Sequence, residues 1–337
     1  MQIRISSRNL IFLMILGLTL IGFLGCGQKT TDQDKGPTGS VGAPKGSSLE
    51  GTVRVSGAWA LYPMMVRWGE EFGKVHPKVR VDISAGGAGK GVADALANLV
   101  DIGMVSREVN PEEVRKGGFF IPVVKDAVFP VLNHGNPVFE KGLVSKGVKK
   151  KTFIDLWING QNLTWGEIAG TDSKDRVQVY TRSDSCGAAE TWAQYLGGKK
   201  QEDLKGVGVY GDPGLAEAVR KDLFGTGYNN LNYAYDARTG LPLPGLQIIP
   251  IDVNENGKVD PGEDLKTKDH AIQAVVSGRY PSPPARDLYL MTKDRFKGPA
   301  KEFIRWVLTE GQQYVNEMGY IKLKETQIIE ALKKIEL

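Results

Sequence analysis

Short apolar segments of strand type alternate with segments of helical periodicity along most of the chain. Val53 and Val55 belong to a short segment of strand type, 79–83 alternate apolar and polar, and 102–105 form an apolar run. The segment up to residue 74 places four large apolar residues on one helical face. They are Met64, Met65, Trp68 and Phe72. This alternation predicts an α/β fold with mixed, mainly parallel sheets and helices on both faces.

Composition narrows the class of protein further. The chain has 337 residues, of which 41% are apolar and 24% charged, which is ordinary for a globular protein. This length leaves room for two lobes, each with its own core. The net charge of +4 is small and the basic residues are scattered, so we expect no nucleic-acid partner.

The first 26 residues have the features of an export signal. Arg4 and Arg8 precede an apolar run, 10–24, which is too short to span a membrane but suits a signal peptide. The run ends in Gly25-Cys26, which resembles the lipobox of bacterial lipoproteins, where the cysteine is diacylated. We therefore predict a signal peptide at 1–25, lipidation of Cys26 and a flexible tether at 26–49. The alternative is a plain secretory signal with an incidental cysteine.

Residues 86–91 form a glycine-rich turn between a predicted strand and a predicted helix. It is not a Walker A motif, because Lys90 is followed by Gly91 rather than Ser or Thr, and it does not fit GxGxxG. Free N–H groups at the start of a helix attract anions. The turn therefore indicates either an anion site or a tight turn that needs glycine.

Several ordered motifs extend this pattern along the chain. They are Ser56–Pro63 with Trp68, Gly86–Gly91, Asp101–Arg107, Thr181–Trp192, Gly227–Tyr228, and 303–304, 310–315 and 319–321. Their order and intervals resemble the substrate-binding protein of the bacterial phosphate ABC transporter, over roughly residues 52–325. The resemblance implies a type II periplasmic-binding-protein fold, in which two α/β lobes close on a ligand.

The resemblance also implies a domain division. Two crossover segments are expected near 133–137 and 227–235. The first predicted lobe would then comprise 50–133 and 228–337, and the second 134–227. A loop at 252–263 would be an insertion in the first.

The resembled family binds phosphate through hydroxyls, backbone N–H groups at helix starts and an arginine. The implied ligand-binding residues here are Ala58, Trp59, Ala60, Ala88, Gly89, Ser106, Arg107, Arg182, Ser183, Cys186, Gly187 and Ala188. The sequence departs from the family at the hydroxyls, since Ala58-Trp59-Ala60, Ala88 and Cys186-Gly187-Ala188 stand where the family carries Ser or Thr. A hydrogen bond to a charged group contributes about 1.5–3 kcal/mol, so losing three removes at least roughly 4.5 kcal/mol. Micromolar affinity corresponds to only about 8.2 kcal/mol, so tight phosphate binding would need other groups.

The resemblance predicts a membrane-anchored lipoprotein that captures phosphate or a phosphate-like oxyanion and delivers it to an ABC permease. We expect a monomer in the cell envelope, facing the periplasm or the exterior. The alternative is a sensor or scaffold lipoprotein whose cleft is filled or repurposed.

Four of these residues have alternative roles. Trp59 is either an aromatic wall for a ligand or a lid that packs against the other lobe. Arg107 and Arg182 either bind the ligand or pair with carboxylates across the lobes. Cys186 is a small residue beside a helix start, although a helix N-terminus could also lower its pKa and make it reactive.

Residues 252–263 match the twelve-residue calcium loop at every diagnostic position. The expected ligands are Asp252, Asn254, Asn256, the carbonyl of Lys258, Asp260 and Glu263. Gly257 at the sixth position allows the sharp turn. We expect a structural Ca²⁺ that clamps this insertion; the alternative is an acidic Asn/Gly turn.

The sequence contains no recognisable catalytic set. His76, His134 and His270 lie in unrelated segments, and no CxxC, HExxH or GxSxG motif occurs. We therefore expect no enzyme; a cysteine enzyme using Cys186 is the remaining alternative.

Overall fold

The computed structural model describes residues 49–337. The predicted signal peptide, Cys26 and all but the last residue of the predicted tether lie outside this range. The strands are β1 Gly51–Gly57, β2 Val79–Ala85, β3 Ile102–Val105, β4 Gly118–Asn133, β5 Val148–Lys149, β6 Gln178–Arg182, β7 Val207–Val209, β8 Gly225–Asn230, β9 Leu246–Ile248, β10 Ile251–Asp252 and β11 Ala285–Lys293. The α-helices are α1 Tyr62–Val75, α2 Ala88–Leu96, α3 Pro111–Arg115, α4 Val144–Lys146, α5 Lys150–Trp157, α6 Trp165–Ala169, α7 Gly187–Tyr195, α8 Gly211–Lys221, α9 Leu231–Ala234, α10 Lys268–Val276, α11 Gly298–Leu308 and α12 Glu325–Glu336. Shorter helical turns are η1 Trp59–Leu61, η2 Phe139–Leu143, η3 Gln201–Asp203 and η4 Glu310–Tyr314.

Strand β4 connects the two parts of the main sheet. Its first part pairs antiparallel with β11, and its last part pairs antiparallel with β8 and β9. The parallel strands β3, β1 and β2 follow in that order beside β11. The parallel strands β8, β6 and β7 follow in that order beside β4. The predicted α/β fold with mixed sheets is confirmed.

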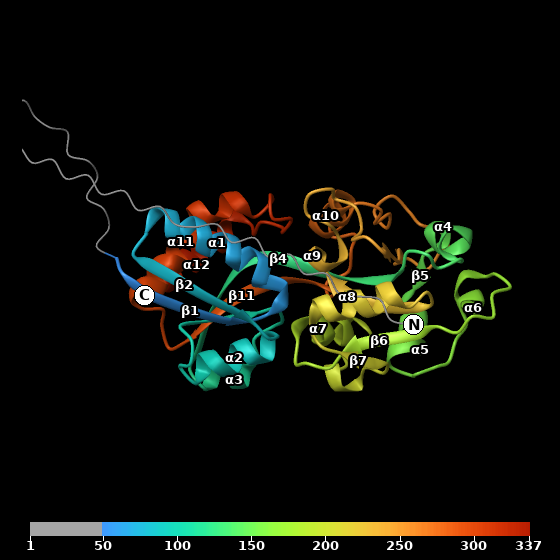
Figure 1. The fold of residues 1–337 in the computed structure, drawn as a ribbon, viewed down its shortest axis with the longest axis horizontal. Helices are drawn as coiled ribbons and strands as arrows, with labels where there is room; N and C mark the ends of the chain where they lie inside the picture. Colours follow the sequence, from blue (N-terminus) through green and yellow to red (C-terminus); the bar gives the residue numbers. More distant parts are fainter. Residues whose placement is uncertain (1–48) are drawn as a thin grey trace, which may run out of the picture. The chain divides into compact units, whose positions relative to one another are not determined.

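Two hydrophobic cores divide the described residues into two lobes. One core contains residues from Val53 to Val124 and from Leu288 to Ile335, and we call residues 49–124 and 288–337 the terminal lobe. The other core comes from residues 127–285 together with Ile321, and we call 127–285 the central lobe. Figure 1 shows β4 and β11 passing from one lobe into the other.

This division differs from the predicted one at both crossover segments. Residues 133–137 form the turn that ends β4, and 227–235 cover the end of β8 and α9, all inside the central lobe. The loop 252–263 also belongs to the central lobe, where β10 pairs with β5 and the amide of Val259 donates to the carbonyl of Ser145. The chain instead passes between the lobes within β4 and β11. These crossovers were missed because neither strand has a turn where it leaves one lobe and enters the other.

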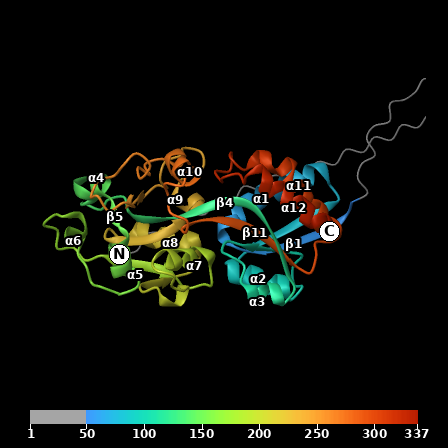
Figure 2. The ribbon, with the colours of Figure 1, turned by 180° about the vertical axis from the view of Figure 1, so that it is seen from behind.

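The terminal lobe buries the predicted face of its first helix. Met64, Met65, Trp68 and Phe72 are all fully buried. The Nε1 of Trp68 donates to the carbonyl of Gly311 at 2.9 Å, which ties α1 to the chain after α11. Helices α1, α11 and α12 cover one face of the sheet, and α2 and α3 the other (Figures 1 and 2).

The central lobe has an aromatic core that positions the end of β6. Trp192 stacks on Tyr228 with ring centroids 5.8 Å apart, and Trp157 meets Trp192 edge-on. The hydroxyl of Tyr228 bonds the hydroxyl of Thr181 at 2.7 Å and accepts from the amide of Arg182 at 3.3 Å. Core packing therefore fixes the strand that carries Arg182.

Candidate functional site: a closed interlobe cleft

Three direct contacts join the two lobes where the predicted ligand loops meet. The amide of Gly89 donates to the carbonyl of Ser185 at 3.2 Å. Gly187 lies so close to the backbone and hydroxyl of Ser106 that a Cβ on it would collide with both. Trp59 lies against Gly211, where an added Cβ would be 3.3 Å from the ring atom Cε2. We call this junction the cleft, comprising 57–61, 86–89, 106, 182–188 and 210–212.

The glycine turn places the start of α2 at the cleft. The amides of Gly86 and Gly87 both donate to the carbonyl of Gly57, at 2.9 and 3.1 Å, which folds the turn back onto β1. Gly87 has a φ of 87°, a conformation that favours glycine. Helix α2 then begins at Ala88, and its second amide, from Gly89, holds the Ser185 carbonyl. The predicted order of strand, glycine turn and helix start is therefore present, and the amide of Gly89 is bonded to a peptide oxygen of the other lobe.

Arg182 lies at the centre of a buried charge cluster at the end of β6. Its side chain is fully buried, and its Nε and Nη2 donate to the carboxylate of Asp184 at 2.8 and 2.5 Å. Its Nη1 lies 2.9 Å from the carboxylate of Asp212. Burial raises the pKa of Asp212, although the neighbouring Arg182 acts against this shift. Of the two alternatives for Arg182, the described structure has carboxylate pairing, but within the central lobe rather than across the lobes.

Asp184 connects this cluster to the rest of the cleft. Its Oδ1 accepts from the amide of Gly211 at 3.1 Å, at the start of α8. Its Oδ2 would lie 3.0 Å from a Cβ on Gly87. Asp184 therefore links Arg182 to both the glycine turn and Gly211, the residue that Trp59 contacts.

Two other predicted ligand residues have different surroundings. The guanidinium of Arg107 donates to both carboxylate oxygens of Glu113, at 3.0 and 2.6 Å. Glu113 also accepts from the amide of Asn110, so this pair closes the cap of α3 within the terminal lobe. Ser183 is exposed, and its amide donates to the carbonyl of Val209 beside β7.

Cys186 has a capping position rather than the properties of a reactive thiol. Its Sγ accepts from the amide of Ala189 at 3.3 Å, and its own amide donates to Gln201 at 2.9 Å. Burial raises the pKa of the thiol to about 12, and the nearby Arg182 only partly opposes this. A helix start can lower the pKa of a thiol, but here desolvation of Cys186 outweighs that effect.

Residues outside the sequence motifs complete the cleft. Arg286 donates to the carbonyl of Gly187 at 2.7 Å and to the hydroxyl of Thr191 at 2.9 Å, at the start of α7. Its Nη2 also lies 3.1 Å from the carboxylate of Asp126. Both charged residues are buried in the two crossover strands. The available sequence signal was a pair of adjacent charged residues, Lys125-Asp126 and Arg286-Asp287, inside each apolar segment.

A chain of hydrogen bonds joins this pair to the Arg182 cluster. Asn230 donates to Asp212 at 2.6 Å and accepts from Arg286. The crossover strands, the start of α7 and the Arg182 cluster therefore form one buried polar network.

The loop 252–263 is compact and contains two buried carboxylates. Asp252 is 1% exposed and accepts from the amides of Asn256 and Gly257, while Glu263 is 7% exposed and accepts from those of Val253 and Asp260. The amides of Asn254 and Asn256 both donate to one oxygen of Asp260, so the three side chains converge. Over residues 49–337, no group of three or more His, Cys, Asp or Glu side chains is gathered closely enough to hold a metal ion. Calcium binding would require the two side-chain amides to turn their oxygens inward.

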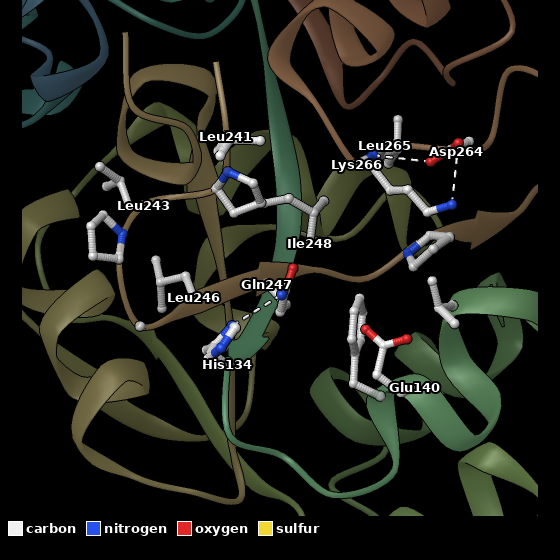
Figure 3. A pocket seen from close by; sticks show the side chains of 16 residues that line it. His134, Glu140, Leu241, Leu243, Leu246, Gln247, Ile248, Asp264, Leu265 and Lys266 are labelled. Atoms are coloured by element: carbon white, nitrogen blue, oxygen red, sulfur yellow. Dashed lines mark hydrogen bonds and ion pairs between the residues drawn. The ribbon is translucent and has the colours of Figure 1, made fainter. Parts of the chain in front are cut away.

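A separate cavity of about 570 Å³ lies in the central lobe. Figure 3 shows Leu241, Leu243 and Leu246 around it, with His134 beside Gln247 at its rim. None of the predicted ligand residues lines this cavity.

Comparisons with known proteins show the family to which the chain belongs. The sequence pattern of the PBP superfamily domain matches residues 42–310, so the chain belongs to the PBP superfamily. Among characterised relatives, the phosphate-binding protein PstS of Bacillus subtilis is 24% identical and covers 96% of this chain and 97% of its own. The phosphate-binding protein PstS of Pseudomonas aeruginosa is 26% identical and covers 87% of this chain and 90% of its own. The resemblance stated from the motifs is confirmed.

Solved structures agree on the fold. A putative phosphate ABC transporter substrate-binding protein from Clostridium perfringens, with bound phosphate, has a TM-score of 0.66. It is 22% identical and covers 81% of this chain and all of its own. The ABC-type phosphate transport receptor from Vibrio cholerae has a TM-score of 0.57 at 17% identity, and covers 80% of this chain and all of its own. Within residues 49–337, no helix is both long enough and apolar enough to cross a bilayer.

Proposed function

We propose that this protein is a substrate-binding lipoprotein that captures phosphate or a phosphate-like oxyanion and delivers it to an ABC permease. The observation that carries the proposal is the convergence of Arg182 with the starts of α2 and α7 at the junction of two lobes. The relatives named as phosphate-binding proteins support the ligand class.

The charge of the cluster favours a particular form of the ligand. A ligand oxygen that reaches Arg182 shares the guanidinium with Asp184 and Asp212. Like charges at short range repel, and low local polarity strengthens the repulsion. A singly charged oxyanion therefore meets less repulsion in this cleft than a doubly charged one.

Thermal unfolding with anions tests the transport function. Phosphate at a hundred times its Kd stabilises the folded chain by about 2.7 kcal/mol and raises Tm. Sulfate, phosphite, molybdate and small phosphonates are compared at the same concentration. An unchanged Tm with every one of these anions would overturn the proposal.

A sensor or scaffold function is the second candidate, and a specific observation favours it. The Gly89–Ser185 hydrogen bond and the packing of Trp59 on Tyr210 join the lobes directly. A cleft held closed in this way would give the same X-ray scattering profile with and without phosphate. The transporter function predicts a compaction on adding phosphate.

The lipid anchor is tested separately. Cys26 follows a signal-type apolar run and a small residue. With lipidation, the wild-type chain incorporates labelled fatty acid and fractionates with membranes, whereas Cys26→Ser incorporates none. Absence of label from the wild-type chain would exclude the anchor.

We also propose that the loop 252–263 binds Ca²⁺. The support is its twelve-residue spacing and the burial of Asp252 and Glu263. The oxygen-rich ligand set suits a hard cation, and the ion would clamp β10 beside β5. A fall in Tm on adding EGTA, reversed by Ca²⁺ but not by Mg²⁺, is the expected result; no change in Tm would exclude the site.

A further inference from the structure

A basic cavity lies at the edge of the terminal lobe, where β11 ends and α11 begins. Its volume is about 290 Å³. The charged side chains that line it are Arg54, Asp101, Lys293, Asp294, Arg295 and Lys297. Four of these six are cations, so the lining has an excess of positive charge. None of the cleft residues lines this cavity, which is therefore separate from the proposed ligand site.

Three of these cations have no anionic partner, and we call Lys293, Arg295 and Lys297 the basic patch. Arg54 differs from them, because its guanidinium is paired with the carboxylate of Asp101 at 3.2 Å. Over residues 49–337, none of the three patch residues forms a salt bridge. Lys293 is half-buried, whereas Arg295 and Lys297 are exposed. The three charges are therefore accessible to a group outside the fold.

Like charges are crowded beside the patch. The guanidinium of Arg295 lies 4.7 Å from the ring centroid of Phe119, and the ammonium of Lys334 lies 5.2 Å from the same centroid. Burial lowers the pKa of Lys334, and the neighbouring Arg295 lowers it further. Two cations held against one ring repel each other, and a negative group would relieve that repulsion. The patch is therefore complementary to an anion.

The patch lies beside the first residues of the described chain. A Cβ on Gly51, the first residue of β1, would be 3.4 Å from the Cγ of Pro299 in the first turn of α11. Pro299 follows Lys297 closely in the sequence, and the predicted tether, 26–49, joins this edge to the predicted lipid site. A flexible chain of about 25 residues has a root-mean-square length of about 27 Å. An anchor at Cys26 would therefore keep this edge of the lobe close to the bilayer.

We propose that the basic patch docks on the anionic lipid headgroups of the membrane that carries the anchor. The headgroup phosphates supply the anionic partners that Lys293, Arg295 and Lys297 lack within the fold. Docking fixes which edge of the terminal lobe is turned toward the bilayer, which a tether alone does not do. The argument from position rests on the proposed lipid anchor, whereas the argument from charge does not, so the two are tested separately.

Vesicle binding of a chain without lipid tests the patch. A chain that starts at residue 26 and carries Cys26→Ser keeps the whole described fold and removes any contribution from a fatty acid. It is sedimented at low ionic strength with vesicles of phosphatidylglycerol and phosphatidylcholine in equal parts, and with vesicles of phosphatidylcholine alone. We expect binding only to the anionic vesicles, and a loss of binding as salt is added, because salt screens exposed charges. Equal binding to both kinds of vesicle, or binding to neither, overturns the inference.

Two variants of this chain remove three charges each, at different places. The patch variant is Lys293→Gln/Arg295→Gln/Lys297→Gln. The control is Lys174→Gln/Lys199→Gln/Lys205→Gln, three exposed lysines of the central lobe. Tm is measured first to confirm that both fold. The patch variant should bind anionic vesicles at least about tenfold more weakly, and the control within about twofold of the parent. Equal weakening of both would indicate an effect of net charge and overturn the docking site.

Two further measurements need no variant of the patch. With anionic vesicles, the backbone amides of 293–298 should exchange hydrogen more slowly, while those of 199–205 keep their rates; unchanged exchange at 293–298 contradicts docking. Inorganic phosphate, added at constant ionic strength, should leave vesicle binding unchanged. Displacement of the vesicles by phosphate would assign the cavity to a free anion instead of a lipid surface. Vesicle binding by the patch, together with no fatty-acid label on the wild-type chain, would overturn the proposed anchor alone.

Discussion

The backbone amide of Gly89 donates a hydrogen bond to the carbonyl oxygen of Ser185 across the two lobes, at 3.2 Å. Gly89 lies in the first turn of α2, where backbone donors and the helix dipole favour a negative group. A neutral peptide oxygen is a weaker partner for such a donor than an anion is. The N-terminal end of α2 therefore takes part in the contact between the lobes, and the proposed ligand would use the same end.

Gly187→Ala is expected to obstruct closure of the cleft. A methyl group at this position collides with the backbone of Ser106 when the lobes are together. We expect phosphate affinity to fall at least about tenfold, equivalent to 1.4 kcal/mol, by calorimetry. X-ray scattering with saturating phosphate should show a larger radius of gyration than wild type.

The matched control is Gly73→Ala in α1, where an added Cβ meets no atom within 4 Å. It should leave phosphate affinity unchanged and stabilise the helix by about 1 kcal/mol. Wild-type affinity in Gly187→Ala would show that closure does not need this contact.

Cys186 makes stability depend on pH in the alkaline range. The pKa of its thiol is raised to about 12 by burial, whereas an unfolded cysteine has a pKa of about 8.5. The folded chain therefore keeps a proton that the unfolded chain loses, so this contribution is complete below pH 8.5 and declines above it. Relative to Cys186→Ser, wild type should lose about 2 kcal/mol of unfolding free energy between pH 8.5 and 10.

Urea denaturation of both proteins at several pH values measures this difference. Serine is the appropriate reference because its hydroxyl can still cap α7 through the amide of Ala189. Parallel pH profiles of the two proteins would show that the thiol is not shielded as the structure indicates.

Removing one member of the buried pair Arg286–Asp126 should be strongly destabilising. Arg286→Met leaves the carboxylate of Asp126 buried without its cation, which costs about 3–5 kcal/mol. Burial already raises the pKa of Asp126, with Arg286 opposing the shift. The double variant Arg286→Met/Asp126→Asn removes both charges and should recover part of the lost stability; additive losses in denaturation would contradict this coupling.

Asp252→Ala tests the calcium loop directly. Asp252 is the first ligand position, and its loss should abolish the Tm difference between Ca²⁺ and EGTA. Glu255→Gln lies in the same loop at a position that offers no ligand, so it should keep that difference. Loss of the difference in both variants would indicate a general effect of charge rather than a bound ion.

Local sequence patterns predicted several elements of the terminal lobe. The spacing of Met64, Met65, Trp68 and Phe72 predicted the buried face of α1, and the segments at 53–55, 79–83 and 102–105 predicted β1, β2 and β3. The first part of β4 contains Pro122, and proline is uncommon inside strands. The chain crosses between the lobes in β4 and β11 rather than at 133–137 and 227–235, the positions that were predicted.

The cleft was predicted less completely, for a physical reason. Motifs identified the loops that meet, such as 86–89 and 182–188, because glycines and helix starts are local signals. The partners of charged groups depend on tertiary packing instead. Arg107 pairs with Glu113, six residues away, but Arg286 pairs with Asp126 from a strand 160 residues earlier. No local pattern can identify such a pair.

The path of β4 and β11 has a consequence for how the chain assembles. The central lobe is one continuous stretch, whereas the sheet of the terminal lobe has β11 inserted between β3 and β4. Until residue 293 has been synthesised, β3 and the first part of β4 each have an unpaired edge that can associate with other chains. The first part of the terminal lobe is synthesised before the central lobe, but its sheet is complete only when β11 is added. A chain truncated before β11 would therefore have a complete central lobe attached to an open, aggregation-prone sheet.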